Sequence, residues 1–290
     1  MKTLIIYGGF GLSSEAEVSI KSGEALLQAM PEAKGFLLTK DNLPELLDTA
    51  SQYDIVIPAL HGNFGEDGQL QTLLEERGIN FIGSGSAASA LCWDKFRYKE
   101  AITKLGKNTP ASKLITTISN LPQSGVLKPI GSGSSIDMLI TKPGESFNHS
   151  HVQTLLDKYQ TLLWEEYIEG IEITVGILKD QPLPVVEIIP PENSWFDYQH
   201  KYDGTTQELV PAIHISEDIQ HQAQQIALTI HTQLGCKDIS RTDMIVKGDT
   251  VYVLETNTMP GLTPESLYPK AANAAGYKLH GLISYLIDFH

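Results

Sequence analysis

Two strand-like runs near the C-terminal end carry four side chains that could do chemistry together: Arg241, Asp243, Glu255 and Asn257. Side chains alternate faces along a strand, so Glu255 and Asn257 point the same way. A turn at residues 247–249 folds Asp243 back beside that pair. Carboxylate and amide oxygens suit a hard cation such as Mg²⁺. The alternative is a surface hairpin whose acidic side chains face water, because short sets of Asp, Glu and Asn are common.

The segment after this hairpin, Met-Pro-Gly-Leu-Thr-Pro-Glu-Ser-Leu-Tyr, places Gly261 and Ser266 near an expected helix start. Backbone N–H groups at such a start can hold an anion. One stretch of chain therefore offers metal ligands, a cation and an anion-binding loop. This combination fits phosphoryl transfer or acyl-phosphate chemistry better than a purely structural hairpin.

A second phosphate-binding candidate is the Gly-Ser-Gly-Ser-Ser loop at 131–135, which follows Lys128 at a strand end. Loop N–H groups and hydroxyls can surround phosphate oxygens while the lysine supplies charge. It is not a Walker A motif, because the lysine precedes the glycines and no Gly-Lys-Ser/Thr occurs. A flexible connector is the alternative. The run at 83–88 has the same two interpretations, and it lacks the third glycine of a dinucleotide fingerprint.

Three further positions carry both a structural and a functional interpretation. His61 lies at a strand end beside glycines, where ligands gather in α/β sheets. Glu15 opens a helix and either complements the helix dipole or contacts a ligand. The polar, aromatic segment 196–204 is either a mobile surface loop or an active-site lid.

Composition narrows the functional classes. The chain has 290 residues, 41% of them hydrophobic, and a net charge of −14 that disfavours binding to a nucleic-acid backbone. Local cations in one cleft can still hold an anionic ligand. The distant Cys92 and Cys236 indicate buried free thiols in a reducing compartment. We find no signal peptide and no membrane-spanning run, so we expect a cytoplasmic protein without a membrane partner.

The first third of the chain alternates strand-like and helix-like segments, which predicts an α/β unit with a mostly parallel sheet. We expect strands at 4–6, 53–60 and 80–85 and helices at 18–29 and 69–77. In the rest of the chain we expect a helix at 87–104, strands at 162–170 and 172–178, a helix between Ser216 and Gly235, and a final helix at 279–286. The Thr/Ser-rich region between 104 and 128 predicts a small middle lobe.

Taken together, these motifs resemble the D-alanine–D-alanine ligases of the ATP-grasp superfamily nearly end to end. The motifs are Ser-Glu-Ala-Glu-Val-Ser near the start, His-Gly-Asn-Phe-Gly-Glu-Asp-Gly at 61–68, 83–95, Leu-Lys-Pro at 127–129, 133–135, 165–175, 197–202, Arg-Thr-Asp at 241–243 and 254–267. Each motif alone is weak, and the ordered set is specific.

The resemblance implies a mixed α/β chain with the ATP-grasp fold. An N-terminal parallel-sheet domain would span 1–84, a small central lobe 85–164 and a larger C-terminal lobe 165–290, with ATP between the two lobes. The resemblance also implies a homodimer. Residues that would contact the nucleotide are Lys95, Lys128, Glu165, Glu166, Tyr167, Ile168 and Glu172. Asp243, Glu255 and Asn257 would bind two Mg²⁺ ions, for which Mn²⁺ could substitute.

The implied reaction joins two D-alanines through an acyl phosphate, for peptidoglycan precursor synthesis. Arg241 and the Gly261 amide would stabilise the oxyanion, and Glu15, with His61 nearby, would hold the first ammonium. Lys201, Ser266 and the Leu267 amide would take the second carboxylate. Tyr202, linked to Glu15 and Ser134, would tie the lid shut and exclude water.

The sequence departs from the family pattern in the phosphate loop, and other functions than D-alanine ligation stay open. Asp137 stands where the family usually has glycine in the phosphate loop, and the retained Lys201-Tyr202 pair is typical of the dipeptide-forming enzymes. A near alternative is an ATP-grasp ligase with another acceptor, such as D-lactate, D-serine or another amino acid. From other classes, the alternatives are a non-catalytic nucleotide-binding module and, more remotely, an NAD-type dehydrogenase.

Overall fold

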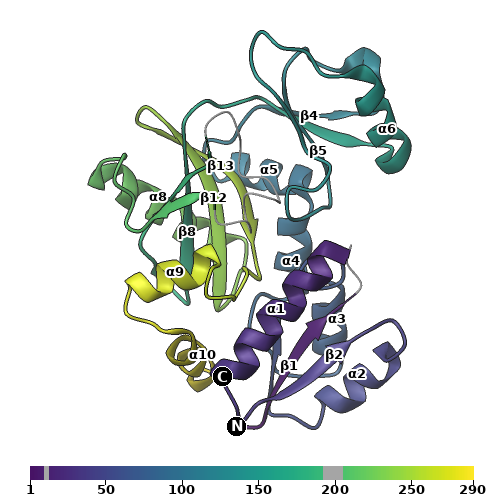
Figure 1. The fold of residues 1–290 in the computed structure, drawn as a ribbon, viewed down its shortest axis with the longest axis vertical. Coiled ribbons are helices and arrows are strands. Elements are labelled where there is room, and N and C mark those ends of the chain that lie inside the picture. Colours follow the sequence, from purple (N-terminus) through teal and green to yellow (C-terminus); the bar gives the residue numbers. More distant parts are fainter. Residues whose placement is uncertain (10–12, 192–204) are drawn as a thin grey trace.

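The computed structural model describes residues 1–9, 13–191 and 205–290, and the strands in these ranges form three sheets (Figure 1). The expected mixed α/β architecture is confirmed: one sheet is parallel and the other two are antiparallel. The predicted limits of the three parts, at 84/85 and 164/165, stay a prediction.

The parallel sheet has the order β2-β1-β3 and confirms the predicted N-terminal α/β unit. Its strands are β1 (Thr3–Gly8), β2 (Lys34–Leu38) and β3 (Ile55–Pro58), and its helices are α1 (Ser13–Ala29), α2 (Leu43–Ala50) and α3 (Gln69–Glu76). The short strand and turn expected at 80–85 appear as a single β-bridge followed by a turn. Only Phe81 forms a bridge, to Val56, and Gly83, with a φ of +113°, then turns the chain away from an extended path.

The expected single helix at 87–104 is wrong, because it breaks at Asp94. The two helices are α4 (Ser86–Trp93) and α5 (Lys95–Lys104). Asp94 is extended, and its carboxylate accepts hydrogen bonds from the backbone N–H groups of Phe96 and Arg97 at 3.1 and 3.0 Å. An aspartate that caps a new helix satisfies donors that would otherwise lack partners. The break makes Lys95 the first residue of α5.

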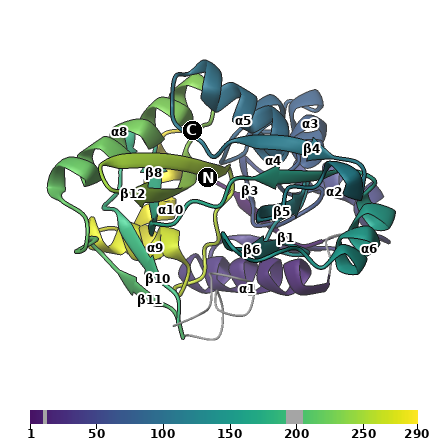
Figure 2. The same cartoon turned by 90° about the horizontal axis from the view of Figure 1, so that it is seen from above.

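The second sheet is antiparallel, with the order β4-β7-β5-β6. Its strands are β4 (Ser112–Ile115), β5 (Gly125–Pro129), β6 (Leu139–Thr141) and β7 (Leu162–Glu165), accompanied by the 3₁₀ helix η1 (Ile118–Asn120) and by α6 (His149–Tyr159). The sequence analysis did not anticipate α6, which buries Val152, Leu155 and Leu156 against this sheet. Figure 2 shows α6 at the end of the molecule opposite to α8.

The third sheet has the order β11-β10-β8-β12-β13, with β9 paired to β8. Its strands are β8 (Ile171–Leu178), β9 (Gln181–Pro182), β10 (Val186–Ile189), β11 (Gln207–Leu209), β12 (Ile239–Lys247) and β13 (Thr250–Asn257), and its helices are α8 (Glu217–Gln233), α9 (Leu267–Ala274) and α10 (Leu279–Asp288). The predicted strands at 162–170 and 172–178 exist, but β7 and β8 lie in different sheets. Ser216 caps α8 as expected, through a 3.3 Å hydrogen bond from the Ile219 N–H.

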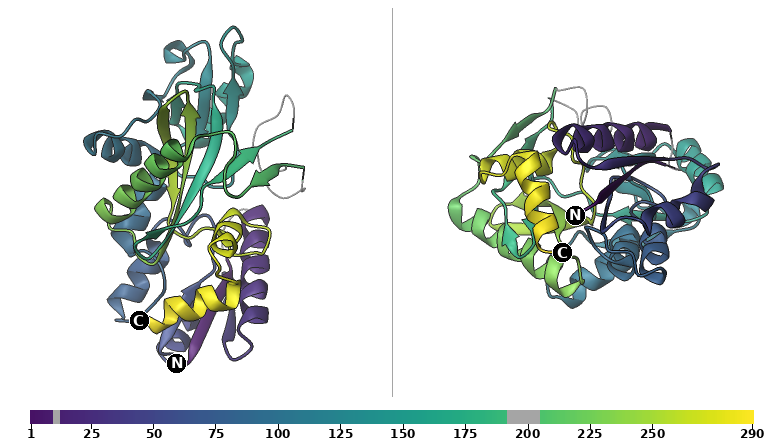
Figure 3. Two further views of the ribbon diagram at one scale, coloured as in Figure 1. Left: turned by 90° about the vertical axis from the view of Figure 1, so that its left-hand side faces the viewer. Right: turned by 90° about the horizontal axis from the view of Figure 1, so that it is seen from below.

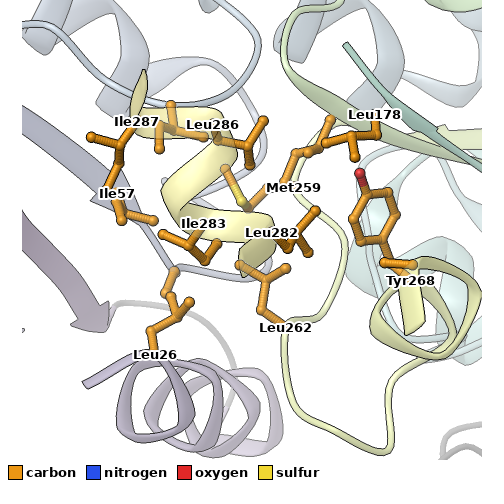
Figure 4. Close-up of a cluster of buried hydrophobic side chains, with 14 of the residues drawn as sticks. Leu26, Ile57, Leu178, Met259, Leu262, Tyr268, Leu282, Ile283, Leu286 and Ile287 are labelled. Carbon is orange, nitrogen blue, oxygen red and sulfur yellow. The ribbon is translucent and has the colours of Figure 1, made fainter. Parts of the chain in front are cut away.

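A hydrophobic cluster joins the N-terminal domain to the C-terminal sheet (Figure 4). It contains Leu26 of α1, Ile57 of β3, Tyr268 of α9 and Ile283 of α10. Figure 3 shows α10 lying next to the N-terminal domain, with α9 between it and the third sheet. The Tyr268 hydroxyl donates a 2.9 Å hydrogen bond to the Ile177 carbonyl of β8. This shared core fixes the loops after the N-terminal strands against the β12–β13 hairpin.

The two cysteines are buried and free, as predicted. Cys92 and Cys236 belong to one core cluster, and a hydrogen bond with the Cys236 thiol raises the pKa of Cys92. Within the described ranges, no helix combines the length and apolar character that a membrane span requires.

Candidate active site

The predicted hairpin forms, and its register brings the four chemical side chains together. Asp243 of β12 lies opposite Glu255 of β13, and Arg241 lies opposite Asn257. The Arg241 guanidinium donates two 2.9 Å hydrogen bonds to the Asp243 carboxylate, one from Nε and one from a terminal nitrogen. The Thr174 hydroxyl of β8 donates a third, at 2.6 Å. The Asp243 carboxylate is therefore held in one orientation by its own sheet.

Lys95 links this hairpin to the Gly/Ser loop between β5 and β6. Its Nζ lies 3.5 Å from Glu255 Oε2 and donates a 2.5 Å hydrogen bond to the Ser132 carbonyl. The break at Asp94 places Lys95 for both contacts, because the second helix starts at this residue. One lysine thus contacts both the hairpin predicted to bind metal and the Gly/Ser loop predicted to bind phosphate.

A cavity of about 560 Å³ lies between the second and third sheets. Its volume is within the usual range for small-molecule sites, roughly 300–1,000 Å³. All seven predicted nucleotide residues line it: Lys95, Lys128, Glu165, Glu166, Tyr167, Ile168 and Glu172. Asp243 and Glu255 line the same cavity. The structure therefore assembles this predicted set around one cavity.

At one edge of the cavity, Glu165 forms a buried ion triad with two lysines. Its carboxylate lies 2.7 Å from Lys128 Nζ and 3.0 Å from Lys99 Nζ. Burial raises the pKa of Glu165, but the charges of Lys128 and then Lys99 outweigh this effect, so its pKa is below the ordinary value. The sequence analysis missed Lys99. The available signal was a lysine between Tyr98 and Ile102, on the apolar face of α5.

A smaller cavity of about 90 Å³ adjoins the large one at Gly133 and Glu255, which line both. Seven further residues of the predicted site line it: His61, Ser134, Arg241, Asn257, Gly261, Ser266 and Leu267. Ser266 precedes α9, and a Cβ at Gly261 would lie 2.7 Å from its hydroxyl oxygen. The close packing at Gly261 leaves the N-terminal end of α9 facing the cavity.

Glu15, with 4% of its surface exposed, is not among the residues that line either cavity, but it packs against Gly133, which lines both. A Cβ at Gly133 would lie 2.7 Å from Glu15 Oε1, and a Cβ at Gly62 would lie 2.3 Å from Oε2. The carboxylate therefore packs directly against the backbone of two loops, and glycine at both positions makes room for it. Gly62 also has a φ of +77°, which favours glycine.

The environment of His61 keeps its imidazole neutral near pH 7. Desolvation, and then the Arg241 charge, lower the pKa of His61 to about 4. Its backbone N–H donates to the Ser19 hydroxyl at 2.9 Å, and its Nε2 lies 3.0 Å from the Ser22 hydroxyl oxygen. Helix α1 thus orients a neutral ring toward the small cavity.

Glu66 is a second residue that the sequence analysis did not single out, although it belongs to the 61–68 motif. Its Oε2 accepts a 2.6 Å hydrogen bond from the Gly62 N–H, and the side chain lines the small cavity. Desolvation raises the pKa of Glu66 to about 7, aided by the charges of Glu15 and Glu255. The available signal was an acid in the glycine-rich loop that follows β3.

Two predicted site residues, Lys201 and Tyr202, lie outside the described residues, so the lid stays a prediction. The strands on either side of that segment, β10 and β11, pair with each other. Glu208 of β11 lines the small cavity.

The donor set around Asp243 fits magnesium rather than a metal held by protein alone. Residues 1–9, 13–191 and 205–290 contain no group of three or more His, Cys, Asp or Glu side chains arranged to hold a metal ion. Mg²⁺ commonly binds one or two carboxylates and completes its shell with water and substrate phosphates. Asp243 and Glu255 on adjacent strands, with the Asn257 amide nearby, are such a set.

Comparisons with known proteins agree with this geometry. Residues 98–288 match the family model of the D-Ala-D-Ala ligase C-terminus, and residues 38–84 match that of the N-terminus. A D-alanine–D-alanine ligase from Syntrophobacter fumaroxidans is 38% identical over 296 residues, which cover 96% of this chain and 94% of the relative.

Two solved structures share the whole fold. The D-alanine–D-alanine ligase of Bacillus anthracis complexed with ATP has a TM-score of 0.81 and 31% identity, with 99% of this chain and 96% of that chain covered. The D-Ala:D-Ser ligase of Enterococcus faecalis has a TM-score of 0.78 and 26% identity, with 99% and 98% covered. The match to the family model and the similarity to a full-length relative show that this chain belongs to the D-alanine–D-alanine ligase family, and its two adjoining cavities agree with this conclusion.

Proposed function

We propose that this protein joins two D-alanines into D-alanyl-D-alanine, with conversion of ATP to ADP and phosphate, and thereby supplies a peptidoglycan precursor. The observation that carries the proposal is the meeting of the two cavities at Gly133 and Glu255. One cavity has the size for a nucleotide, and the other is small and lined by groups suited to amino acids. The resemblance to D-alanine–D-alanine ligases over 96% of the chain supports the same conclusion.

ATP binds in the large cavity in this proposal. The base lies against Glu165, Glu166, Tyr167 and Ile168, the ribose hydroxyls reach Glu172, and Lys95 and Lys128 face the phosphates. Because Lys95 already contacts Glu255 and the Ser132 carbonyl, it stands at the boundary between the cavities. The terminal phosphate therefore comes to lie beside the small cavity.

Asp243, Glu255 and Asn257 hold Mg²⁺ in this proposal, two ions in all. When bound, the metal neutralises phosphate charge during transfer. The donor chemistry supports this assignment, since two carboxylates and an amide lie on adjacent strands and both carboxylates line the large cavity.

The first step is attack by a carboxylate oxygen of one D-alanine on the γ-phosphorus of ATP. The bond from that phosphorus to the bridging oxygen breaks, and an acyl phosphate and ADP form. Glu15 binds the ammonium of this D-alanine, with the neutral His61 beside it. The burial of Glu15 against the Gly133 backbone supports this role, because it places the ammonium next to the phosphate loop.

The second step is attack by the amine of the other D-alanine on the carbonyl carbon of the acyl phosphate. The ammonium of that D-alanine gives up one proton to solvent before it attacks and a second to the departing phosphate, and a tetrahedral oxyanion forms and collapses as the C–O bond to phosphate breaks. Arg241 and the Gly261 N–H stabilise the oxyanion. Ser266 and the Leu267 N–H, at the start of α9, hold the second carboxylate together with Lys201. Ser134 and Tyr202 close the site against water.

The domain limits 1–84, 85–164 and 165–290, a homodimer and a cytoplasmic location belong to the same proposal. These three points rest on the resemblance to the family.

A second candidate is ligation of D-alanine to D-serine. The relative from Enterococcus faecalis, named a D-Ala:D-Ser ligase, covers this chain at 26% identity, and that likeness favours keeping D-serine in the test. The higher identity, 38%, to a D-alanine–D-alanine ligase favours D-alanine as the acceptor.

The test is release of phosphate from Mg-ATP with a panel of D-alanine, L-alanine, D-serine and D-lactate. We expect turnover with D-alanine alone and formation of its dipeptide. No turnover with any acceptor, despite ATP binding, would leave only a nucleotide-binding module. In parallel, Glu255→Gln should abolish most turnover because it weakens a metal ligand. Near-normal rates in that variant would place the metal elsewhere.

A further inference from the structure

In the loop between β5 and β6, three residues other than glycine have positive φ angles. Ser134, Ser135 and Asp137 have φ values of +53°, +56° and +57°. Side chains other than glycine rarely adopt this left-handed region, but aspartate is one of those that tolerate it best. Asp137 can therefore replace the family's usual glycine without forcing the loop into another shape.

The Asp137 carboxylate faces α6 rather than the nucleotide cavity. Its Oδ2 accepts a 2.7 Å hydrogen bond from Lys158 Nζ and a 2.6 Å hydrogen bond from the Tyr159 hydroxyl. Ile136 and Met138, on either side of it in the chain, line the cavity. The residue thus faces away from the site while its two neighbours face into it.

The Asp137 carboxylate lies beside the last turn of α6, where an anion needs hydrogen-bond donors to be stable. The carboxyl end of a helix carries partial negative charge, which disfavours a nearby anion. Lys158 in that last turn offsets this effect. Although partial burial raises the pKa of Asp137, the hydrogen bonds from Lys158 and Tyr159 outweigh it and lower the pKa below the ordinary value. The carboxylate is therefore charged when it binds α6.

The other end of the same loop is fixed independently. Lys95 Nζ binds the Ser132 carbonyl at 2.5 Å, and the Ile136 N–H closes a turn by donating to the Gly133 carbonyl at 3.1 Å. The loop is thus attached to α5 before the turn and to α6 after it. Figures 1 and 2 show α6 beside the sheet of β4 and β5, on the outer side of the molecule.

We propose that Asp137 is a positioning residue that binds the phosphate loop to α6 and thereby holds residues 132–136 in their ATP-binding arrangement. The inference rests on the proposed function, since it assigns the loop to ATP. A loop that is ordered before binding loses less conformational freedom when the nucleotide arrives, which raises affinity. The anchor acts on binding of ATP rather than on the chemical step, because Asp137 touches neither cavity.

The test uses Tyr159→Phe, which removes one hydroxyl and keeps the ring, together with the double variant and Asp137→Gly, which removes the carboxylate and suits the backbone φ of +57°. Asp157→Asn, an exposed change on α6 away from the loop, is the matched control. Hydrogen exchange of residues 131–138 in the ligand-free protein reports the anchor. ATP affinity and kcat at saturating ATP report its consequence, and melting temperature reports folding.

For Tyr159→Phe we expect faster exchange in 131–138 and an ATP affinity about tenfold weaker, the lower end of the range for loss of one hydrogen bond to a charged group, because Lys158 still binds the carboxylate. The kcat at saturating ATP should stay within about twofold, because the lost contact assists binding and not the transition state. The double variant should bind ATP no more weakly than Asp137→Gly, since removal of the carboxylate already removes the hydrogen bond from Tyr159.

Unchanged exchange or unchanged ATP affinity in Tyr159→Phe, with normal ATP binding by the wild type, would overturn the anchor alone. Full additivity in the double variant would do the same. A wild-type protein that does not bind ATP would instead overturn the proposed function, and the anchor's role with it.

Discussion

Arg241 and Asp243 bind each other through two parallel hydrogen bonds of 2.9 Å from their places two residues apart on β12. Both side chains lie on the same face of the strand, because side chains alternate. The cation assigned to the oxyanion therefore also orients the carboxylate assigned to the metal. A planar guanidinium can make this paired contact, and an ammonium cannot.

Arg241→Lys should for this reason be far from conservative. We expect kcat to fall by about 10²–10³, the range for loss of one oxyanion-stabilising donor, with ATP affinity changed only a few-fold. Steady-state kinetics and ATP titration measure the two effects. Arg77→Lys, in an exposed pair with Asp48, is the control and should be silent. Equal kinetics for Arg241→Lys and the wild type would remove Arg241 from the reaction.

Gly133→Ala should disturb the meeting point of the cavities. The new Cβ would lie 2.7 Å from Glu15 Oε1, so either the carboxylate or the loop must shift. Displacement of about 1 Å in a reacting group can cost about 100-fold in rate, and we expect a loss of that order in kcat/KM. Gly281→Ala in α10, where a Cβ meets nothing within 4 Å, is the control. Wild-type kcat/KM in Gly133→Ala would show that Glu15 does not act at this point.

Lys99→Met should destabilise the fold by leaving Glu165 with one lysine partner. Lys99 and Glu165 are each 2% exposed, and removal of one member of a buried ion pair typically costs about 3–5 kcal/mol. The remaining Lys128 contact should keep the loss near the lower value. Urea denaturation measures it, with the exposed Lys104→Met on the same helix as the control. Equal unfolding free energies for the two variants would make the Lys99 contact energetically irrelevant.

Glu66→Gln should change the pH dependence of stability. The pKa of Glu66 is raised from 4.5 to about 7 in the folded protein, so the folded state binds this proton more tightly than the unfolded state. Stability is therefore lost as pH rises through that interval. At about 1.4 kcal/mol per pKa unit, the rise from 4.5 to about 7 corresponds to about 3.5 kcal/mol, which is the order of stability that the variant should gain over the wild type above pH 7.

Urea denaturation of metal-free protein at pH 5 and pH 8 measures this difference. Glu76→Gln, an exposed change on α3, controls for loss of a negative charge. If Glu66→Gln differed from the wild type by the same amount at both pH values, the raised pKa would be wrong.

The parts of this site that the sequence predicts are those set by local rules. The tight turn before Thr250 and strand alternation predict the hairpin and the shared face of Glu255 and Asn257, and the structure has both. Pairing counted from that turn would place Asp243 opposite Leu254, but a β-bulge between Asp243 and Met244 shifts the register and places Asp243 opposite Glu255. The cap at Ser216 and the helix after it follow local signals in the same way.

The parts that the sequence does not predict depend on contacts between distant segments. Lys99 and Glu165 are 66 positions apart, and only the packing of α5 against β4, the strand next to β7, makes them an ion pair. Strands β7 and β8 are neighbours in the chain but belong to different sheets, because the cavity opens between them. The raised pKa of Glu66 likewise arises from burial beside Glu15, which lies in the first turn of α1.

The central claim is that the D-alanine carboxylate itself attacks ATP. The most direct measurement uses D-alanine labelled with ¹⁸O in both carboxylate oxygens and mass spectrometry of the released phosphate and dipeptide. We expect one labelled oxygen in each phosphate and one in the new peptide carbonyl, because the C–O bond breaks on the carbon side of the acyl phosphate. Phosphate without label from D-alanine would mean that water attacks ATP, and it would contradict the ligase mechanism.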